Sequence, residues 1–140
     1  MKVMLDLNVL LDYFQKREPH YQHSSIVLSE VLKGNFAGVA PAHALTTIYY
    51  ISAKHATRER ANEIIDWLLA HLEIAPANKS AFARARDLQS SDFEDAVVAS
   101  LAEVSQCDII ITRNVSDFAT SPIAAMTPEE FVKRYVSQNN

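Results

Sequence analysis

Acidic side chains lie at three places in the chain where an expected strand ends or an expected helix begins. Asp6 directly follows the apolar segment Val3–Leu5, and Asp117 lies in the loop after an isoleucine-rich segment. Asp95 lies on the first turns of a helix expected to start near Ser91. Because ligands of open parallel sheets bind outside the carboxyl ends of the strands, we expect these three carboxylates to meet at one edge.

Carboxylates gathered in this way predict a divalent cation. They repel one another strongly at an effective dielectric constant of about 20, so their convergence without a cation would be destabilising. Mg²⁺ and Mn²⁺ prefer oxygen ligands, and Mg²⁺ usually combines a few carboxylates with waters and phosphate oxygens. Such a cation activates water and neutralises the charge that grows on a phosphate under attack. The pattern therefore predicts phosphate-ester chemistry at a Mg²⁺ or Mn²⁺ site.

Most of these acids also have an interpretation that involves no cation. Asp6 is placed to cap the helix that follows it, and Asp117 is a residue type common in turns. Ser91 and Glu94 fit a capping box, which favours Glu94 as a capping partner over Glu94 as a ligand. Asp95 lies beside apolar positions of its helix, so we expect it to point partly inward, where its charge needs a partner.

The elements that position these residues alternate along the chain. Short apolar runs predict strands and longer amphipathic segments predict helices, which together indicate an α/β fold with a mostly parallel sheet. The strands are expected at Val3–Leu5, Phe36–Ala40, Glu73–Ala75 and Asp108–Thr112, with an edge strand at Ile123–Met126. The helices are expected at Val9–Phe14, from Pro19 or His20 to Lys33, and at Ala42–Ala56, Arg58–His71, Lys79–Leu88 and Ser91–Val104, with a last helix starting at Pro128 after a Thr127 cap.

The composition limits the class of protein. The 140 residues fit a single domain spanning residues 1–140, and the net charge of −4 argues against holding nucleic acid by bulk charge alone. The two glycines, Gly34 and Gly38, are too few for a P-loop or a dinucleotide-binding fingerprint. Cys107 is the single cysteine, and no signal peptide or membrane-spanning run is present, so we expect a soluble cytoplasmic protein.

Three segments of the chain resemble motifs of the PIN-domain nucleases, closest to their VapC-like toxin branch. In that family a first strand delivers an aspartate that is followed two residues later by a small polar residue. A central acidic helix and a closing strand with its loop come later in the chain. The matching segments here are Val3–Asp12, Asp92–Ala96 followed by Ala99 and Ala102, and Ile109–Phe118. Their order and separation match across nearly the whole chain.

The resemblance implies a PIN-like three-layer α/β/α fold with a mostly parallel sheet of four to five strands. It also implies a Mg²⁺- or Mn²⁺-dependent ribonuclease that acts on RNA, is often a homodimer and, in the toxin branch, is blocked by a small antitoxin. Carried over position by position, it makes Asp6, Asp95 and Asp117 the catalytic and metal-binding acids. By the same resemblance, Asn8, Thr112 and Asn114 hold ligands or waters through hydrogen bonds.

One departure from the family pattern concerns a glutamate that many members carry on the helix after the second strand. The corresponding segment 42–50 contains no acid, and Thr46 or Thr47 is expected at the position. A hydroxyl holds a water but supplies no negative charge, so a second cation should bind more weakly. Asp92, which also suits the positive end of its helix, or Glu94 is expected to compensate.

Basic residues near the expected site are scattered. Arg113, beside the loop that carries Asn114, is the basic residue that best fits a phosphate contact. Lys16, Arg17 and the basic segment 54–60 fit either a solvated surface or RNA contacts, and His43 fits a proton shuttle, a substrate contact or a local structural role.

Three classes of function are therefore compared. The leading hypothesis is an endoribonuclease that is the toxin of a toxin–antitoxin pair. The alternative is a catalytically weakened PIN-fold module that binds RNA or a protein, motivated by the missing glutamate. A phosphotransfer receiver or phosphatase also uses aspartates at strand ends, but a phosphatase of the haloacid dehalogenase type needs a second aspartate where Asn8 stands. A receiver needs an acidic pair near the first strand and a late lysine, and neither is present.

Overall fold

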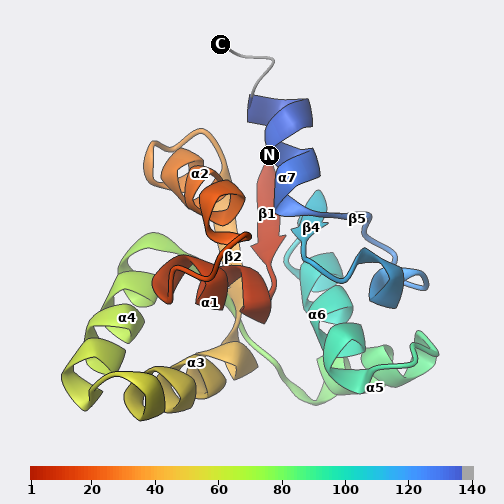
Figure 1. Cartoon of the computed structure of the whole chain (residues 1–140). Coiled ribbons are helices and arrows are strands. Elements are labelled where there is room, and N and C mark those ends of the chain that lie inside the picture. Colours follow the sequence, from red (N-terminus) through yellow and green to blue (C-terminus); the bar gives the residue numbers. More distant parts are fainter. Residues whose placement is uncertain (137–140) are drawn as a thin grey trace.

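The centre of the molecule is a sheet of five parallel strands. The computed structural model describes residues 1–136. The strands are β1 (Lys2–Leu5), β2 (Ala37–Pro41), β3 (Glu73–Ala75), β4 (Ile109–Ile111) and β5 (Ala125–Met126), in the spatial order β3-β2-β1-β4-β5 (Figure 1). In the register of the central strands, Met4 lies opposite Val39 on one side and Ile110 on the other. The predicted sheet of four to five strands is confirmed.

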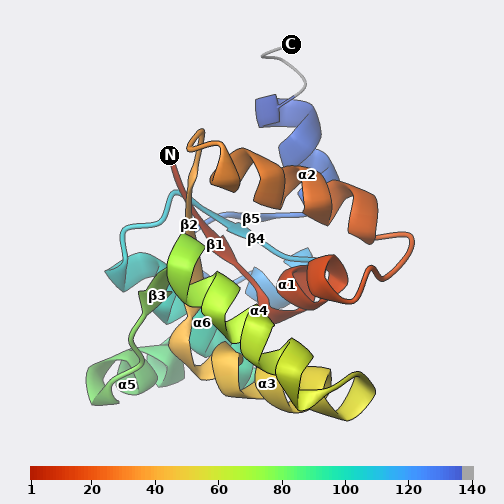
Figure 2. The ribbon, with the colours of Figure 1, turned by 90° about the vertical axis from the view of Figure 1, so that its left-hand side faces the viewer.

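Helices cover both faces of this sheet and complete three layers. Figures 1 and 2 show α1 to α4 on one side of the strands and α5 and α6 on the other. The helices are α1 (Leu7–Phe14), α2 (Tyr21–Leu32), α3 (Ala42–His55), α4 (Arg58–His71), α5 (Lys79–Asp87), α6 (Phe93–Val104) and α7 (Pro128–Phe131), which a wider helical turn extends over Val132–Val136. The predicted α/β/α architecture is confirmed.

The side chains of β1 show why both faces must be covered. Val3 and Leu5 point into the core that α1, α2, α3, α4 and α7 build, whereas Met4 points into the core of α5 and α6. All three are fully buried, as expected for a central parallel strand that is covered on both faces. Cys107 also lies in the second core, where burial raises the pKa of its thiol to about 11, so it is a small core residue as predicted.

The strand order creates a crevice at one edge of the sheet. β1 lies between β2 and β4, so the chain leaves β1 towards one half of the sheet and later returns to the other half. In open α/β sheets, this reversal of strand order separates the loops at the carboxyl ends of the two strands and leaves room for a ligand. The loops that follow β1 and β4 carry Asp6 and residues 112–117, respectively.

Most boundaries lie within two residues of the sequence-based prediction, and the starts of α1 and α6 differ because of their caps. α4 and β3 have the predicted ends. α6 begins at Phe93 because Asp92 is its N-cap and accepts a hydrogen bond from the backbone N–H of Asp95 at 3.0 Å. The predicted capping box of Ser91 and Glu94 is therefore wrong. α1 begins at Leu7, two residues earlier than predicted, because Asp6 caps it directly.

The loop after β4 contains an element that the sequence pattern did not predict. Val115–Phe118 forms a short 3₁₀ turn that carries Asp117 and buries Phe118. Four residues are too short for a helical apolar period to be recognised. The last residues of the predicted single domain, 137–140, lie outside the described part of the chain. Among the residues described, no helix is long and apolar enough to cross a bilayer.

Candidate metal centre

A cleft of about 270 Å³ lies at the carboxyl ends of β1 and β4. The strand ends, the first turn of α6 and the 3₁₀ turn after β4 supply its walls. Its lining residues are Asp6, Leu7, Asn8, Asp92, Glu94, Asp95, Asn114 and Asp117. The structure thus brings together most of the site residues predicted from the sequence, and five of these eight are carboxylates.

Asp6 is held in one orientation by two elements. Its carboxylate accepts a hydrogen bond from the backbone N–H of Leu7 at 2.8 Å through Oδ1. Through Oδ2 it accepts one from the hydroxyl of Thr112, also at 2.8 Å. The Thr112 hydroxyl in turn accepts from the backbone N–H of Asn114 at 3.1 Å. Because Thr112 and Asp6 are both buried, the ends of β1 and β4 fix this carboxylate together.

The first turn of α6 brings two more carboxylates to Asp6. Asp6, Glu94 and Asp95 each offer an oxygen atom, and these atoms lie within 4.8 Å of one another. Glu94 and Asp95 are adjacent on α6, and the Asp92 cap fixes the backbone of that turn. The side chain of Glu94 is partly exposed, whereas Asp95 is buried. Oxygen ligands gathered at this spacing suit a hard divalent cation such as Mg²⁺ or Mn²⁺.

The pKa values of Asp6 and Asp95 are raised, which shows that burying these carboxylates close together costs free energy. Burial raises the pKa of Asp95 to about 7, and the negative charges of Asp6, Asp92, Glu94 and Asp117 add to the effect. Burial also raises the pKa of Asp6, although the hydrogen bond from Thr112 opposes it. A divalent cation would reverse this cost by favouring the ionised forms. The donor set therefore fits a cation.

The third carboxylate of the tight cluster differs from the predicted one. Asp117 lines the cleft and adds to the repulsion on Asp95, but its oxygen atoms are not part of the 4.8 Å group. Glu94, expected mainly as a capping partner, takes that place. Because Asp92 is the cap, Glu94 is free of the capping role and its side chain faces the cleft. The one-residue shift of the cap could not be predicted because Ser and Asp are both strong caps.

Thr46 does not take the position of the missing glutamate. It is exposed on α3, its hydroxyl donates to the carbonyl oxygen of His43 at 3.3 Å, and it does not line the cleft. The α3 residue that approaches the acids is His43, whose Nε2 lies 3.6 Å from Oε1 of Glu94. The exposed Thr47 does not line the cleft either. His43, which reaches the acids, therefore lies about one helical turn before the predicted residue Thr46.

Arg113 faces away from the cleft. Its Nε lies 2.8 Å from Oδ2 of Asp12 on α1, an ion pair whose angle is bent away from that of a linear hydrogen bond. Asp12 is fully buried, which raises its pKa, while Arg113, His20 and Arg17 act in the opposite direction. Arg113 therefore anchors the loop after β4 to α1, and its predicted phosphate contact stays a prediction. Asp12, an acid four residues after Asn8, was the sequence feature that could have indicated this ion pair.

The sequence as a whole matches the description of a known domain. The family described as "PIN domain" matches residues 2–116, more than half of the chain. The chain belongs to the PIN domain family. This PIN domain is also 28% identical over 139 residues to Ribonuclease VapC1 of Aquifex aeolicus (strain VF5), with 96% of this chain and 95% of that protein covered.

Solved structures share the fold of this PIN domain at low sequence identity. A toxin–antitoxin complex from Klebsiella pneumoniae contains a chain that matches with a TM-score of 0.68 at 20% identity, covering 90% of this chain and 97% of that one. VapC20 of Mycobacterium tuberculosis, described as a sarcin–ricin loop cleaving toxin, matches with a TM-score of 0.63 at 7% identity, covering 77% and 86%. At these identities the structures show a common fold.

The raised pKa of Asp95 predicts how stability depends on pH. Between about pH 4, near the ordinary pKa of this side chain, and about pH 7, the folded protein binds a proton that the unfolded chain releases. Stability therefore falls as the pH rises through this window when a chelator is present. Urea unfolding across the window should show the decline, and Asp95→Asn should flatten it. The exposed Asp66→Asn is the matched control and should leave it unchanged. Equal slopes for wild type and Asp95→Asn would contradict the prediction.

The ion pair of Arg113 and Asp12 predicts unequal effects of removing its two partners. Arg113→Ala leaves a fully buried carboxylate without its nearest cation, so the free energy of unfolding should fall by about 3 kcal/mol. Asp12→Asn should cost less, because the guanidinium of Arg113 is 29% exposed and can reach water. The double substitution should be more stable than Arg113→Ala alone. Urea titration of the four proteins measures this, and a larger loss for Asp12→Asn would refute the assignment.

Proposed function

We propose that this PIN domain is a Mg²⁺- or Mn²⁺-dependent endoribonuclease and the toxin of a toxin–antitoxin pair. The observation that carries the proposal is the cluster of Asp6, Glu94 and Asp95, two of them buried and with raised pKa values, at the carboxyl edge of the sheet. The names of its relatives support it: a ribonuclease, a toxin–antitoxin complex and a toxin that cleaves the sarcin–ricin loop.

The residues of the cleft divide into ligands and positioning groups. Asp6, Asp95 and Glu94 would hold the cation, and Asp117 at the rim adds negative charge. When bound, the cation supplies water activation and neutralisation of charge on the scissile phosphate. The amides of Asn8 and Asn114 line the cleft and can orient a phosphate oxygen or a water through hydrogen bonds.

His43 is suited to hold a proton beside the reaction. Its Nε2 lies 3.6 Å from the carboxylate of Glu94, and neither ring nitrogen has a hydrogen-bond partner among the described residues. Buried ring nitrogens without a partner cost free energy unless a substrate or water supplies one. His43 is therefore placed to exchange a proton at Nε2 with a group in the cleft.

The alternative of a catalytically weakened binding module has less support. It rested on the missing acid of α3 and on Thr46 in its place. Glu94 supplies a third carboxylate from α6, so the cluster does not depend on α3 for its negative charge. We further propose a small antitoxin as partner, a homodimer and a cytoplasmic location, where the buried thiol of Cys107 stays reduced.

The first test of the proposal is the substitution Asp6→Asn. Its amide keeps the shape of the side chain but removes a charge from the cation site, so RNA cleavage should fall by about 100-fold or more. Cleavage of structured RNA with Mg²⁺ or Mn²⁺ is measured by gel, and circular dichroism checks that the fold is intact. Asp66→Asn, an exposed substitution on α4, should cut as wild type does. Undiminished cutting by Asp6→Asn would overturn the proposal.

The second test concerns the hydroxyl that orients Asp6. Thr112→Val keeps the volume but removes the donor to Asp6, so the affinity for Mn²⁺ should fall about 10- to 100-fold. Thr112→Ser keeps the donor and should stay close to wild type. Calorimetric titration with Mn²⁺ measures both variants. If the two bind Mn²⁺ equally well, the hydroxyl has no positioning role.

A further inference from the structure

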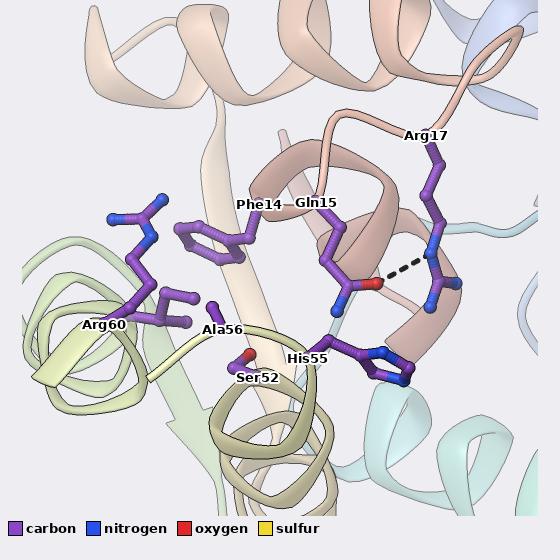
Figure 3. Close-up of a pocket in the computed structure, with 8 residues that line it drawn as sticks. Phe14, Gln15, Arg17, Ser52, His55, Ala56 and Arg60 are labelled. Atoms are coloured by element: carbon purple, nitrogen blue, oxygen red, sulfur yellow. Dashed lines mark hydrogen bonds between the residues drawn. The ribbon is translucent and has the colours of Figure 1, made fainter. Parts of the chain in front are cut away.

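A second, larger pocket lies where α1 and α3 end and α4 begins. It has a volume of about 490 Å³ and is separate from the acidic cleft. Figure 3 shows its labelled side chains converging from three segments of the chain. The lining residues are Phe14, Gln15, Arg17, Ser52, His55, Ala56, Arg60 and Ile64. We refer to it as the basic pocket, because it contains two arginines and a histidine and no carboxylate.

The acidic cleft cannot by itself hold the backbone of an RNA strand. Five carboxylates line it, and no Lys or Arg does among the described residues. Phosphates that flank the reacting bond are repelled by these acids unless cations outside the cleft attract them. Arg113, which directly precedes the cleft residue Asn114 in sequence, is paired with Asp12. The cations that hold the strand must therefore lie elsewhere.

The cations of the basic pocket are set at its two ends. Figure 3 shows Arg60 beside the ring of Phe14 at one end, and Arg17 and His55 at the other. The Nε of Arg17 donates to Oε1 of Gln15 at 2.8 Å, which orients the guanidinium. Its remaining ion pair, with Asp12, is long at 3.9 Å. Among the described residues, Arg60 pairs only with the exposed Glu63 at 3.3 Å, so a phosphate can compete for it.

The wall of the pocket offers a rigid ring and an unused hydroxyl. The ring of Phe14 packs edge-on against Tyr13 and Trp67, with centroids 5.0 and 5.2 Å away, which holds it in place. The hydroxyl of Ser52 is buried and has no hydrogen-bond partner among the described residues. In Figure 3 its oxygen turns upward from α3, towards the side of the pocket where Gln15 lies. A buried hydroxyl without a partner is costly, so a polar ligand would satisfy it.

Two helices connect the acidic cleft to the basic pocket. α1 begins beside Asp6 in the cleft and ends at Phe14 in the pocket, about 10 Å away at 1.5 Å per residue. α3 carries His43 next to the acids and Ser52 about two and a half turns further along, in the pocket. The two sites are therefore close enough for one RNA strand to span the distance between them.

We propose that the basic pocket binds a backbone phosphate and the adjoining base of the RNA strand whose cleavage takes place in the acidic cleft. The guanidinium groups of Arg17 and Arg60 contact phosphate oxygens, and the ring of Phe14 contacts the unpaired base, as aromatic side chains do in single-strand binding. The absence of carboxylates from the pocket lining favours an anionic polymer over a mixed-charge protein surface. This inference rests on the proposed function.

The test measures RNA binding without cleavage. Fluorescence anisotropy with a short unpaired RNA is recorded for the full chain carrying Asp6→Asn, alone and combined with Arg60→Gln or Arg17→Gln. Each arginine substitution should weaken binding about 3- to 10-fold and lower the slope of log affinity against log salt by about 0.7. Arg86→Gln, on the exposed face of α5, removes the same charge away from the pocket and should change neither. Arg60→Gln is decisive if Arg17→Gln disturbs folding through Asp12.

A second measurement separates this inference from the proposed function. In the active chain, Arg60→Gln should raise KM for the RNA and leave kcat unchanged, because the substitution does not touch the reacting atoms. If the wild type cleaves no RNA but the pocket variants still lose RNA binding, the ribonuclease proposal is refuted and the proposal for the pocket stands. If Arg60→Gln binds RNA as tightly as the Arg86→Gln control does, the proposal for the pocket is overturned. Pocket variants that keep their RNA affinity but no longer bind a synthetic glutamate-rich peptide would also overturn the proposal. That result would assign the pocket to a protein partner.

Discussion

Electrostatic repulsion between buried carboxylates is the constraint on which the rest of this structure depends. Asp6 follows β1, Glu94 and Asp95 begin α6 almost ninety residues later, and the three bring their oxygen atoms within 4.8 Å of one another. Burial raises the pKa of Asp95 to about 7, and the repulsion of the neighbouring acids adds to this effect. The fold must therefore oppose this repulsion with rigid elements, because flexible loops would let the acids move apart.

Two helix N-termini contribute to that opposition. α1 begins directly after Asp6 and α6 begins directly after Asp92, so both helices direct their positive ends towards the acidic cleft. A helix N-terminus stabilises a nearby anion by roughly 0.3–1 kcal/mol. The same acids therefore have two roles. Asp6 is both a cap and a member of the cluster, and the capping and cation-binding interpretations of this residue are compatible.

The distribution of charge matters more than its total. Five carboxylates lie in one cleft at the strand ends, while Arg17, His55 and Arg60 line the basic pocket where α1 and α3 end and α4 begins. A third set, the buried Asp12 with the partly exposed Arg113, ties the loop after β4 to α1. The net charge of −4 describes none of these three sites. It is the sum of groups with opposite tasks.

The sequence by itself determined the strands, the helices, the layers and most of the site. Apolar runs such as Ile109–Ile111 and the acids that follow them are local signals, and parallel strands place their carboxyl ends at one edge. The tertiary structure alone decided three points: that Glu94 rather than Asp117 completes the tight cluster, that His43 rather than Thr46 approaches it, and that Arg113 turns to Asp12. The first depends on the cap position of α6, the second on which turn of α3 meets the cleft, and the third on the path of the loop after β4. A one-residue change turns a helical side chain by about 100°, which periodicity in the sequence cannot resolve.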